Sequence, residues 1–588
     1  MKQPRWMVVA LLTLCAAVAT AADGDFTFVV LGDRTGGHQE GVYGRVVEAA
    51  LGESADLYLT VGDQIEGYSA NPDRVRNEWT EYLGIVEALD GPLYQTPGNH
   101  DIWDGASEEL WREVTGREPN YSFDHAGAHF VVLDTSRLDN PAELPLETLT
   151  WLEDDLDAHR EAQPTIVLYH KPLWYNFVAV GRDDPLHELL VDYGVDAVFC
   201  GHYHTYAADV IDGITYTMVG SSGGRMWDDI PEHGHFYHYV VGRVGDGGLE
   251  LEVVPLEHAG RWEHGYLSAA EVHLFDDIRR GTFSFEPVFV GERPGGESVD
   301  FELTVTNPVD DPIDGELTWD SRGDWSVEPG GVEVELEPGA SRSFAFTAEL
   351  APGGAFYPLP WVELPVPYRA DRAFRLGSYP RILRTEVARP LVEPLVDGVI
   401  DELEWLGAGV TESFACDQGC PSDAEQTRFY WGYGPEHLYV AAECRQQDPD
   451  SIVARAAERD GAVYYDDCVG LFLAPAGPAE DVYQLYLSIR DVVFDQRIFP
   501  TDGGLDADAD WNADFRHATA YEDGVWGAEL AIPFSELGVE APTPGDAWRV
   551  NFRRKQMAAG AVADWQFPID YDAAGFGRLL FLGAEAVD

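Results

Sequence analysis

Five apolar stretches in the N-terminal third of the chain each end in a short polar motif. The stretches are 26–31, 55–61, 93–96, 165–169 and 195–200, and they are followed by Gly32-Asp33, Gly62-Asp63, Gly98-Asn99-His100-Asp101, His170 and Gly201-His202-Tyr203-His204. Helical patterns cover 75–89, 146–161 and 185–193. Continuous apolar runs separated by helices are typical of buried strands in βαβ units. Because ligands bind at the carboxyl ends of strands in such sheets, we expect the five motifs to share one site.

The five motifs offer carboxylate, amide and imidazole groups and no thiolate. A single Asp at a strand end usually caps the next helix, so each motif alone is weak evidence. Together they provide the ligands that suit Fe, Mn or Zn. Two such ions about 3.5–4 Å apart can neutralise a phosphate ester and lower the pKa of a bridging water. A histidine that binds no metal can then protonate the leaving oxygen.

In order and type, these motifs resemble those of the calcineurin-like metallophosphoesterases over residues of about 23–260. The resemblance implies an α/β domain at 23–262, built as a sandwich of two mixed sheets flanked by helices. It also implies hydrolysis of a phosphate mono- or diester by a metal-bound hydroxide. Six ligands follow from the resemblance: Asp63 bridging both metals, Asp33 and His204 on the first, and Asn99, His170 and His202 on the second. His100 would be the catalytic acid and Asp101 would orient it.

The first motif departs from the family pattern. Many members carry Asp-x-His there, whereas this chain has Asp33-Arg34-Thr35. Thr35 is the weaker ligand, so the first metal is expected to bind less tightly or to recruit another group, for which His38 is the candidate. Glu66 stands where purple acid phosphatases carry a tyrosine, which argues against that subgroup and its Tyr–iron bond.

Two arginines are candidates for contacts to the substrate phosphate. Arg34 lies in the first motif, and Arg225 follows the glycine-rich segment 220–224. A guanidinium can hold phosphate through two parallel hydrogen bonds. A structural salt bridge is an equally good interpretation of either residue.

The N-terminus reads as a signal peptide over residues 1–22. Lys2 and Arg5 precede an apolar run at 6–18, and small residues follow at 19–21. An uncleaved anchor is the alternative, but the run is shorter than the roughly 20 residues that span a bilayer. We therefore expect a secreted, periplasmic or extracellular protein with no membrane span in the mature chain.

The formal net charge of −66 limits the partners of the chain. So acidic a surface repels nucleic acid phosphates, and we expect no nucleic acid binding. A phosphorylated substrate would have to be attracted by the metals themselves.

Two all-β sandwich domains are expected after the first domain, which makes the chain multidomain. Residues 275–390 alternate strictly between apolar and polar positions, as at 301–305 and 332–336, and predict an immunoglobulin- or fibronectin-like spacer. Residues 391–588 resemble family 9 carbohydrate-binding modules in the motifs Asp397-Gly398-x-Ile400-Asp401, Leu438–Ala441, Asp466-Asp467-x-Val469 and Trp526–Pro533.

The second resemblance implies a β-sandwich that binds sugar and holds a structural calcium. Trp431, Trp511 and Trp565 are candidates for covering a sugar ring, although a tryptophan in a sandwich is more often a core residue. Four cysteines cluster in this region: Cys416, Cys420, Cys444 and Cys468. In an exported protein they predict disulfides, and of three possible pairings we favour Cys416–Cys420 with Cys444–Cys468 over a zinc site.

The sequence thus predicts a secreted metal-dependent phosphoesterase with accessory β-domains. The alternative is a surface carbohydrate-binding protein whose phosphoesterase-like domain is inactive, because Thr35 weakens the first metal site.

Overall fold

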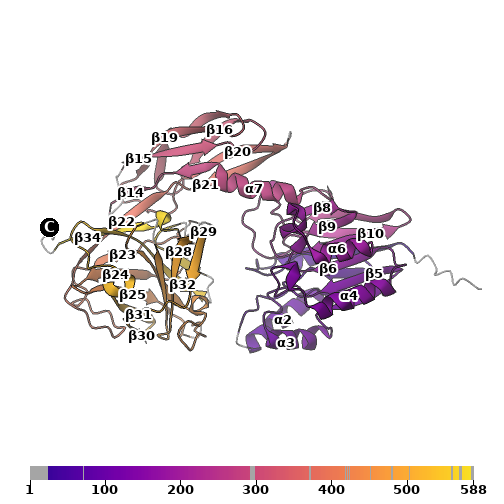
Figure 1. Cartoon of the computed structure of the whole chain (residues 1–588), viewed down its shortest axis with the longest axis horizontal. Coiled ribbons are helices and arrows are strands. Elements are labelled where there is room, and N and C mark those ends of the chain that lie inside the picture. The colour runs from indigo at the N-terminus through magenta and orange to yellow at the C-terminus, as the bar shows by residue number, and fades with distance from the viewer. Residues whose placement is uncertain are drawn as a thin grey trace, which may run out of the picture. The chain divides into compact units, whose positions relative to one another are not determined.

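The computed structural model describes residues 24–583, apart from 70–71, 292–297, 370–371, 417–418, 420, 423, 450–451, 478–480, 502–503, 558–560 and 568–571. The chain divides into two compact units, and the division falls between Asp276 and Asp277 (Figure 1). The expected signal peptide at 1–22 lies outside the described residues. Within the described part, no helix is both long and apolar enough to cross a membrane.

The N-terminal unit contains two six-stranded sheets. The first has the order β12 (Trp262–Glu263), β11 (Gly248–Pro255), β10 (His238–Gly245), β1 (Phe26–Leu31), β2 (Leu57–Thr60) and β3 (Leu93–Tyr94). The second has the order β4 (Tyr121–His125), β5 (Ala128–Leu133), β6 (Thr165–Tyr169), β7 (Ala197–Cys200), β9 (Ile214–Met218) and β8 (Ala207–Ile211). Strands β1, β2 and β3 run parallel, as do β5, β6, β7 and β9, so each sheet is mixed and its parallel part ends at one edge.

The inner faces of the two sheets form a buried apolar core. Phe28, Val30 and Leu59 of the first sheet pack with residues such as Phe130 and Ile166 of the second. The alternate residues of β1 face the other way, onto a second core. Every residue of β2, β5, β6 and β7 is therefore buried, which explains why β2, β6 and β7 read as continuous apolar runs.

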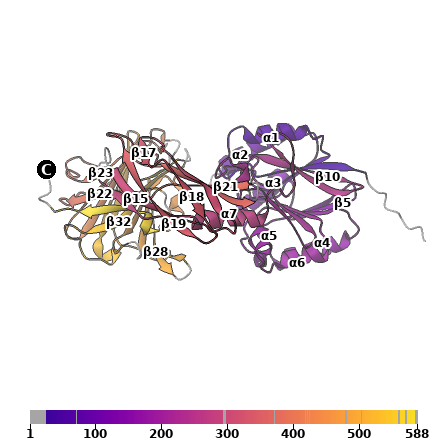
Figure 2. The same ribbon diagram turned by 90° about the horizontal axis from the view of Figure 1, so that it is seen from above.

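Helices cover the outer faces of the sandwich. α1 (Val42–Leu51), α2 (Pro72–Val86) and α3 (Gly105–Thr115) contribute to the core on the outside of the first sheet. α4 (Leu146–Ala158), α5 (Leu173–Asn176) and α6 (Pro185–Asp192) follow strands of the second sheet and lie on its side in Figure 2. The predicted α/β sandwich of two mixed sheets is confirmed.

The C-terminal unit begins with a sandwich of two four-stranded sheets. The first sheet has the order β13 (Phe283–Phe285), β15 (Ser298–Thr306), β19 (Ser341–Leu350) and β17 (Trp325–Glu328). The second has the order β18 (Gly331–Leu336), β16 (Ile313–Asp320), β20 (Trp361–Arg369) and β21 (Arg372–Ser378). The inward positions of β15 and β19, such as Phe301, Leu303 and Phe346, are buried while their neighbours are exposed. The period-two pattern in the sequence is thus the pleat of a half-buried strand.

The second part of this unit is a larger β-structure around a core rich in tryptophan and phenylalanine. Its strands are β22 (Ile382–Pro390), β23 (Gly409–Thr411), β24 (Thr427–Tyr433), β25 (His437–Arg445), β26 (Cys468–Ala474), β27 (Val482–Ser488), β28 (Val493–Thr501), β29 (Gly504–Asp508), β30 (Arg516–Glu522), β31 (Val525–Pro533), β32 (Ala547–Gln556), β33 (Ala561–Asp564) and β34 (Gly577–Phe581). β22 joins β34 to β24 and so links the two faces of the structure.

The two β-structures are more closely connected than a spacer and a separate module would be. β14 (Val288–Val290), which lies between β13 and β15 of the first sandwich in the chain, pairs with β22. Phe289 on β14 lies beneath the guanidinium groups of Arg549 and Arg578, at 4.3 and 4.6 Å from its ring centre. Residues 277–588 therefore form one compact unit.

Two of the three tryptophans considered for sugar binding are core residues. Trp431 and Trp565 are fully buried, and Trp431 donates its indole hydrogen to the carbonyl of Val387. Trp511 is partly buried and lies 5.0 Å from the ring of Tyr483. The sugar-contact interpretation is wrong for Trp431 and Trp565.

The motif around Asp397 has a structural role that the structure makes plain. Buried Glu529 accepts hydrogen bonds from the main-chain nitrogens of Asp397 and Gly398, at 2.9 Å each. Its other oxygen accepts from the indole of Trp405, also at 2.9 Å. These motif residues hold one loop against β31.

The predicted Cys444–Cys468 disulfide is wrong, because both residues are free, buried thiols. Cys444 faces the main core, whereas Cys468 faces a separate cluster behind β26. Neighbouring Val469 takes the main-core position instead, so Cys468 points away from Cys444. Cys416 is disulfide-bonded, and its predicted partner Cys420 lies outside the described residues.

Candidate metal centre

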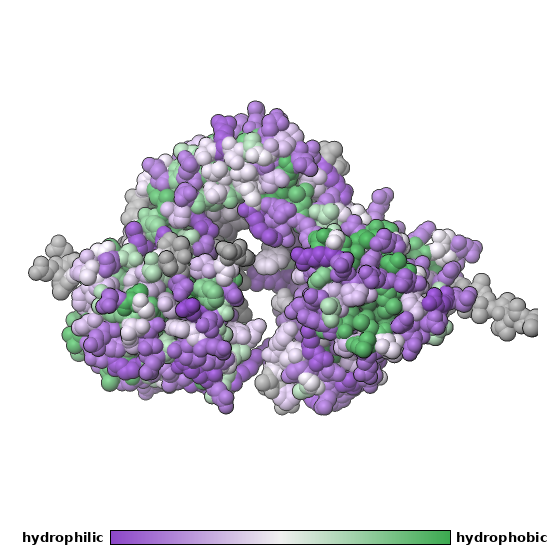
Figure 3. All heavy atoms as spheres, viewed as in Figure 1, coloured by the Kyte–Doolittle hydropathy of each residue, from purple (hydrophilic) through white to green (hydrophobic). Residues whose placement is uncertain are grey.

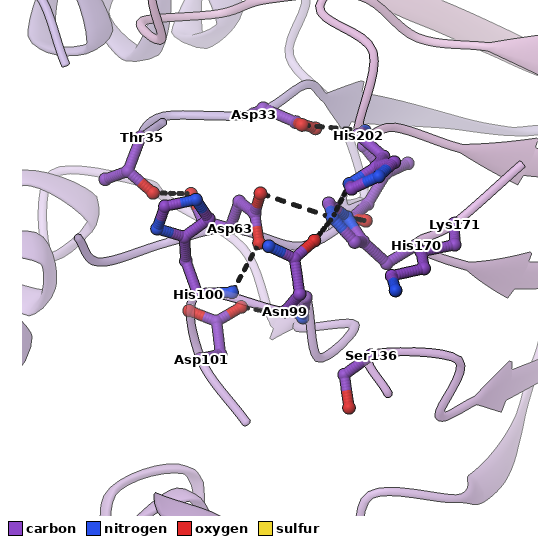
Figure 4. A network of polar contacts seen from close by, with 12 residues as sticks. Asp33, Thr35, Asp63, Asn99, His100, Asp101, Ser136, His170, Lys171 and His202 are labelled. Atoms are coloured by element: carbon purple, nitrogen blue, oxygen red, sulfur yellow. Dashed lines mark hydrogen bonds and ion pairs between the residues drawn. The ribbon is translucent and has the colours of Figure 1, made fainter. Parts of the chain in front are cut away.

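The polar motifs meet at the carboxyl edge of the parallel strands, as Figure 4 shows. Asp33 follows β1, Asp63 follows β2 and His170 follows β6, while Asn99-His100 and His202 come from the loops after β3 and β7. Asp63 lies among the other side chains and belongs to both clusters of closely spaced ligand atoms, Asp63–His170–His202 and Asp33–Asp63–His204. The backbone is left-handed at Asp63, His202 and His204, with φ of 55°, 79° and 53°. Such strained conformations in non-glycine residues concentrate at functional sites.

His170 carries the clearest sign of a cation site. Its Nδ1 lies 2.9 Å from the carbonyl of Val61, which can only accept, so Nδ1 carries the hydrogen. Its Nε2 faces Asn99 Oδ1 at 2.9 Å, Asp63 Oδ2 at 3.2 Å and His202 Nδ1 at 3.2 Å. Nε2 thus faces two oxygen acceptors and a second imidazole nitrogen, and a cation among these atoms, or a proton on Nε2, satisfies them.

The first cluster shows the same feature at Asp33. This carboxylate is fully buried, and its Oδ2 accepts from the main-chain nitrogen of His202 at 2.7 Å. His204 Nε2 lies 3.3 Å from the same oxygen. Asp33 Oδ1 is buried without a hydrogen-bond partner among the described residues. An orphaned buried carboxylate oxygen is costly unless an ion occupies its lone pairs.

Main-chain carbonyls fix the orientation of three histidines. Each of these histidines turns Nδ1 to a carbonyl oxygen: His170 to that of Val61 at 2.9 Å, His204 to that of Arg225 at 2.5 Å, and His100 to that of Glu66 at 2.7 Å. Each ring consequently presents Nε2 to the site. Orienting partners of this kind set the tautomer and raise the basicity of a metal-binding histidine.

The site is strongly charged in the absence of ions. Burial raises the pKa of the Asp63 carboxyl, but the charges of His170 and His100 outweigh it and leave that pKa below its usual range. Burial lowers the pKa of His170, but the Asp63 carboxylate raises it overall, to about 9. Burial and the neighbouring His170 charge lower the pKa of His202 to about 3. The Asp63 carboxylate and the His170 imidazole thus stabilise each other's charged forms.

The family model of the calcineurin-like phosphoesterases matches residues 26–206, which carry all of these groups. This part of the chain is similar to the calcineurin-like phosphoesterases.

Two curated relatives each align with part of the chain. Purple acid phosphatase 15 of Arabidopsis thaliana is 30% identical over 207 residues, which are 29% of this chain and 38% of the relative. The human serine/threonine-protein phosphatase CPPED1 is 28% identical over 240 residues, 35% of this chain and 74% of the relative. The chain thus spans less than half of the first relative and about three quarters of the second. Among solved structures, a family 9 carbohydrate-binding module of Caldicellulosiruptor kristjanssonii matches 35% of this chain and 97% of its own length, at 16% identity and a TM-score of 0.26.

Thr35 of the phosphoesterase domain has a structural task. It is fully buried, and its hydroxyl lies 2.6 Å from the carbonyl of Ile65 and 2.9 Å from that of Asp63 (Figure 4). The first cluster thus has Asp33, Asp63 and His204 as ligands, without a side chain at the position of the usual histidine. His38 does not replace it, because His38 belongs to neither cluster and its Nδ1 contacts Glu66 at 3.0 Å.

The predicted role of Asp101 in orienting His100 is wrong. The Asp101 carboxylate is buried and accepts main-chain hydrogen bonds from Gly98 at 2.8 Å and from Gln64 at 2.9 Å. It therefore ties the loop after β3 to the loop after β2. The carbonyl of Glu66 orients His100 instead.

The two arginines differ in their surroundings. Arg34 is buried, and its guanidinium bonds the carbonyl of Gln64 and the carboxylate of Glu81, so its predicted substrate contact is wrong. Arg225 is exposed beside the loop that contains Gly37. Its contact with a substrate phosphate stays a prediction.

Glu66 and Tyr68 contact the candidate site in ways that the sequence interpretation missed. The Glu66 carboxylate holds the 37–38 loop through the main-chain nitrogens of Gly37 and His38, at 3.3 and 2.8 Å. Tyr68 Oη accepts a hydrogen bond from Asn99 Nδ2 at 3.2 Å. No family signal at these positions would have indicated either role, which depends on how the loops after β2 and β3 meet.

Proposed function

We propose that the protein is an exported, metal-dependent phosphoesterase that hydrolyses a phosphate mono- or diester at a dinuclear centre. The observation that carries this proposal is the convergence of Asn99, Asp63 and His202 on Nε2 of His170. The names of the phosphatase relatives and the predicted signal peptide support the proposal.

The residues present fit two ions. Asp63 would bridge them, with Asp33 and His204 on one side and Asn99, His170 and His202 on the other. The ions, when bound, supply positive charge for the phosphate and lower the pKa of a water molecule. Carboxylate, amide and imidazole ligands suit Fe, Mn or Zn.

His100 would complete the chemistry as the acid. Its Nδ1 is occupied by the Glu66 carbonyl, so Nε2 is the atom that can hold a transferable proton. Its main-chain nitrogen donates to Asp63 Oδ1 at 3.0 Å, which fixes the residue beside the bridging carboxylate. As the bond from phosphorus to the leaving oxygen breaks, that oxygen would take the Nε2 proton, because a neutral alcohol leaves more readily than an alkoxide.

Elemental analysis joined to a phosphatase and phosphodiesterase panel, on one preparation loaded with Mn²⁺, Zn²⁺ or Fe, tests this proposal. We expect two equivalents of metal per chain and hydrolysis of at least one ester class. The second candidate is a carbohydrate-binding protein with an inactive phosphoesterase domain. Only the missing ligand at Thr35 favours this second candidate. A protein that retains no metal after loading, or that hydrolyses no ester, would support it.

A further inference from the structure

Two exposed aromatic side chains of the N-terminal unit, Tyr68 and Tyr203, lie beside the metal centre. In the described part of this unit, the exposed large apolar residues include three aromatic ones: Tyr68 at 46%, Tyr203 at 38% and Trp227 at 83%. Figure 3 shows that hydrophilic residues make up much of the face drawn there. Single exposed apolar residues need no explanation, but their gathering beside one site does.

Tyr68 is held directly against the catalytic residues. Its ring lies 5.0 Å from that of His100, at an interplanar angle of 80°, and 5.5 Å from that of Trp103. Its hydroxyl accepts from Asn99. The structure keeps Tyr68 at φ 45°, which is costly for a bulky side chain.

Gly67 shows how tightly this loop is drawn to the site. A Cβ on Gly67 would lie 1.9 Å from the carbonyl oxygen of His100, so the backbone tolerates only glycine there. The close approach places the Tyr68 ring next to the ring of His100, the residue that would protonate the leaving group.

Tyr203 lies on the His202 side of the centre. Its ring is 5.1 Å from that of His202 and 5.7 Å from that of Tyr175. Its hydroxyl exchanges hydrogen bonds with the amide of Asn176, at 3.0 and 3.3 Å. The carbonyl of Arg225 accepts a hydrogen bond from His204, and Trp227 lies two residues after Arg225 in the sequence.

From this arrangement we propose that the leaving group of the substrate carries a planar aromatic ring, as in aryl or nucleoside phosphates, and that Tyr68 and Tyr203 bind it. The inference rests on the proposed function and adds the substrate class. Tyrosine and tryptophan offer rigid π faces that stack on planar rings with little loss of conformational entropy. The net charge of −66 also favours an uncharged ring over a leaving group with further anionic groups.

Isothermal titration of the full chain, loaded with Mn²⁺, against phenylphosphonate and methylphosphonate tests the inference. Both ligands carry the same phosphonate and neither is hydrolysed, so their ratio of affinities isolates the ring. We expect phenylphosphonate to bind about tenfold more tightly to the unmodified protein. Tyr68→Ala and Tyr203→Ala should each lower the ratio about three- to fivefold, and Tyr68→Phe should retain it because the ring remains.

Tyr521→Ala is the matched control, since Tyr521 is an exposed tyrosine (37%) on β30 of the other unit. It should leave the ratio unchanged. Equal binding of the two phosphonates, or an unchanged ratio in both alanine variants, would overturn the inference. Cyclohexylphosphonate binding as tightly as phenylphosphonate would also overturn it, in favour of a non-planar ring. A metal-loaded protein that hydrolyses no phosphate ester would instead overturn the proposed function.

Discussion

Two clusters of histidine and aspartate in the N-terminal unit differ in how their hydrogen bonds are satisfied. One is the metal centre, and the other is formed by Asp124, His129, Asp155 and His159. Both contain groups of ligand atoms close enough to hold an ion. Composition and proximity therefore do not distinguish them.

In the second cluster, protons account for every contact of the central histidine. His129 is buried, its Nδ1 donates to Asp124 at 2.7 Å, and its Nε2 donates to Asp155 at 2.9 Å. His159 stacks on it at 3.8 Å and 10°, and donates Nδ1 to the carbonyl of Asp155 at 2.7 Å. An ion bound by both parallel rings would lie outside the plane of at least one. In this cluster each nitrogen of His129 has one carboxylate partner, whereas His170 Nε2 faces Asn99 Oδ1, Asp63 Oδ2 and His202 Nδ1 together.

The comparison predicts that losing the bridging carboxylate has the largest effect. Asp63→Asn should lower kcat/KM by about 10⁴-fold, because an amide cannot bridge two ions and about 5–6 kcal/mol of charge stabilisation disappears. Activity assays with elemental analysis on the same preparation check this. Asp124→Asn, which alters the other cluster, should leave metal content and kcat/KM within about twofold. Two equivalents of metal and full activity in Asp63→Asn would contradict the distinction.

A smaller loss is expected when the centre keeps its ligands but loses its acid. His100→Ala should lower kcat about 10²–10³-fold on alkyl phosphates while metal content stays the same. The loss should shrink for a p-nitrophenyl ester, whose leaving group departs without a proton. A loss that is equal for both ester types would show that His100 acts only on the phosphate charge.

For the cluster around His129 the prediction concerns stability and pH. His129→Leu leaves Asp155 without its buried cation and should cost about 2–3 kcal/mol at pH 6. Burial lowers the pKa of His129, but hydrogen bonds and charges from Asp155 and Asp124 raise it overall. A raised folded-state pKa stabilises the protein fully below the unfolded value near 6.5, and this stabilisation is lost as pH rises through the folded pKa.

Denaturant unfolding of the original protein and His129→Leu at pH 6 and pH 9.5 measures the difference, which should be smaller at the higher pH. Metal content should not change. A difference that is independent of pH would mean that His129 acts by packing alone.

Sequence patterns were sufficient to predict the strands that end at the metal centre. β1 and β6 have the predicted bounds, because both faces of these strands are buried and every residue is apolar or small. Strand β5 escaped notice, since buried His129 interrupts its pattern and only its tertiary partners make it acceptable there.

The ligands were accessible to sequence reasoning because their chemistry lies in the side chains. The carbonyls of Val61, Glu66 and Arg225 were not, since any residue supplies a carbonyl and only the fold decides which one meets a histidine. Arg34 was misassigned for the same reason, as Glu81 lies 47 residues away in sequence.

The smallest predicted effect is that of Thr35→Val, which tests whether Thr35 is a metal ligand. Thr35→Val keeps the shape of the side chain but removes the hydroxyl from the Ile65 carbonyl. The Asp63 carbonyl still accepts from the main-chain nitrogens of Arg34 and Thr35, at 3.2 and 3.1 Å. One buried hydrogen bond is therefore lost, at a cost of about 1–2 kcal/mol in the free energy of unfolding. Metal content and kcat/KM should stay within about twofold, and loss of one metal equivalent would make the Thr35 hydroxyl a ligand after all.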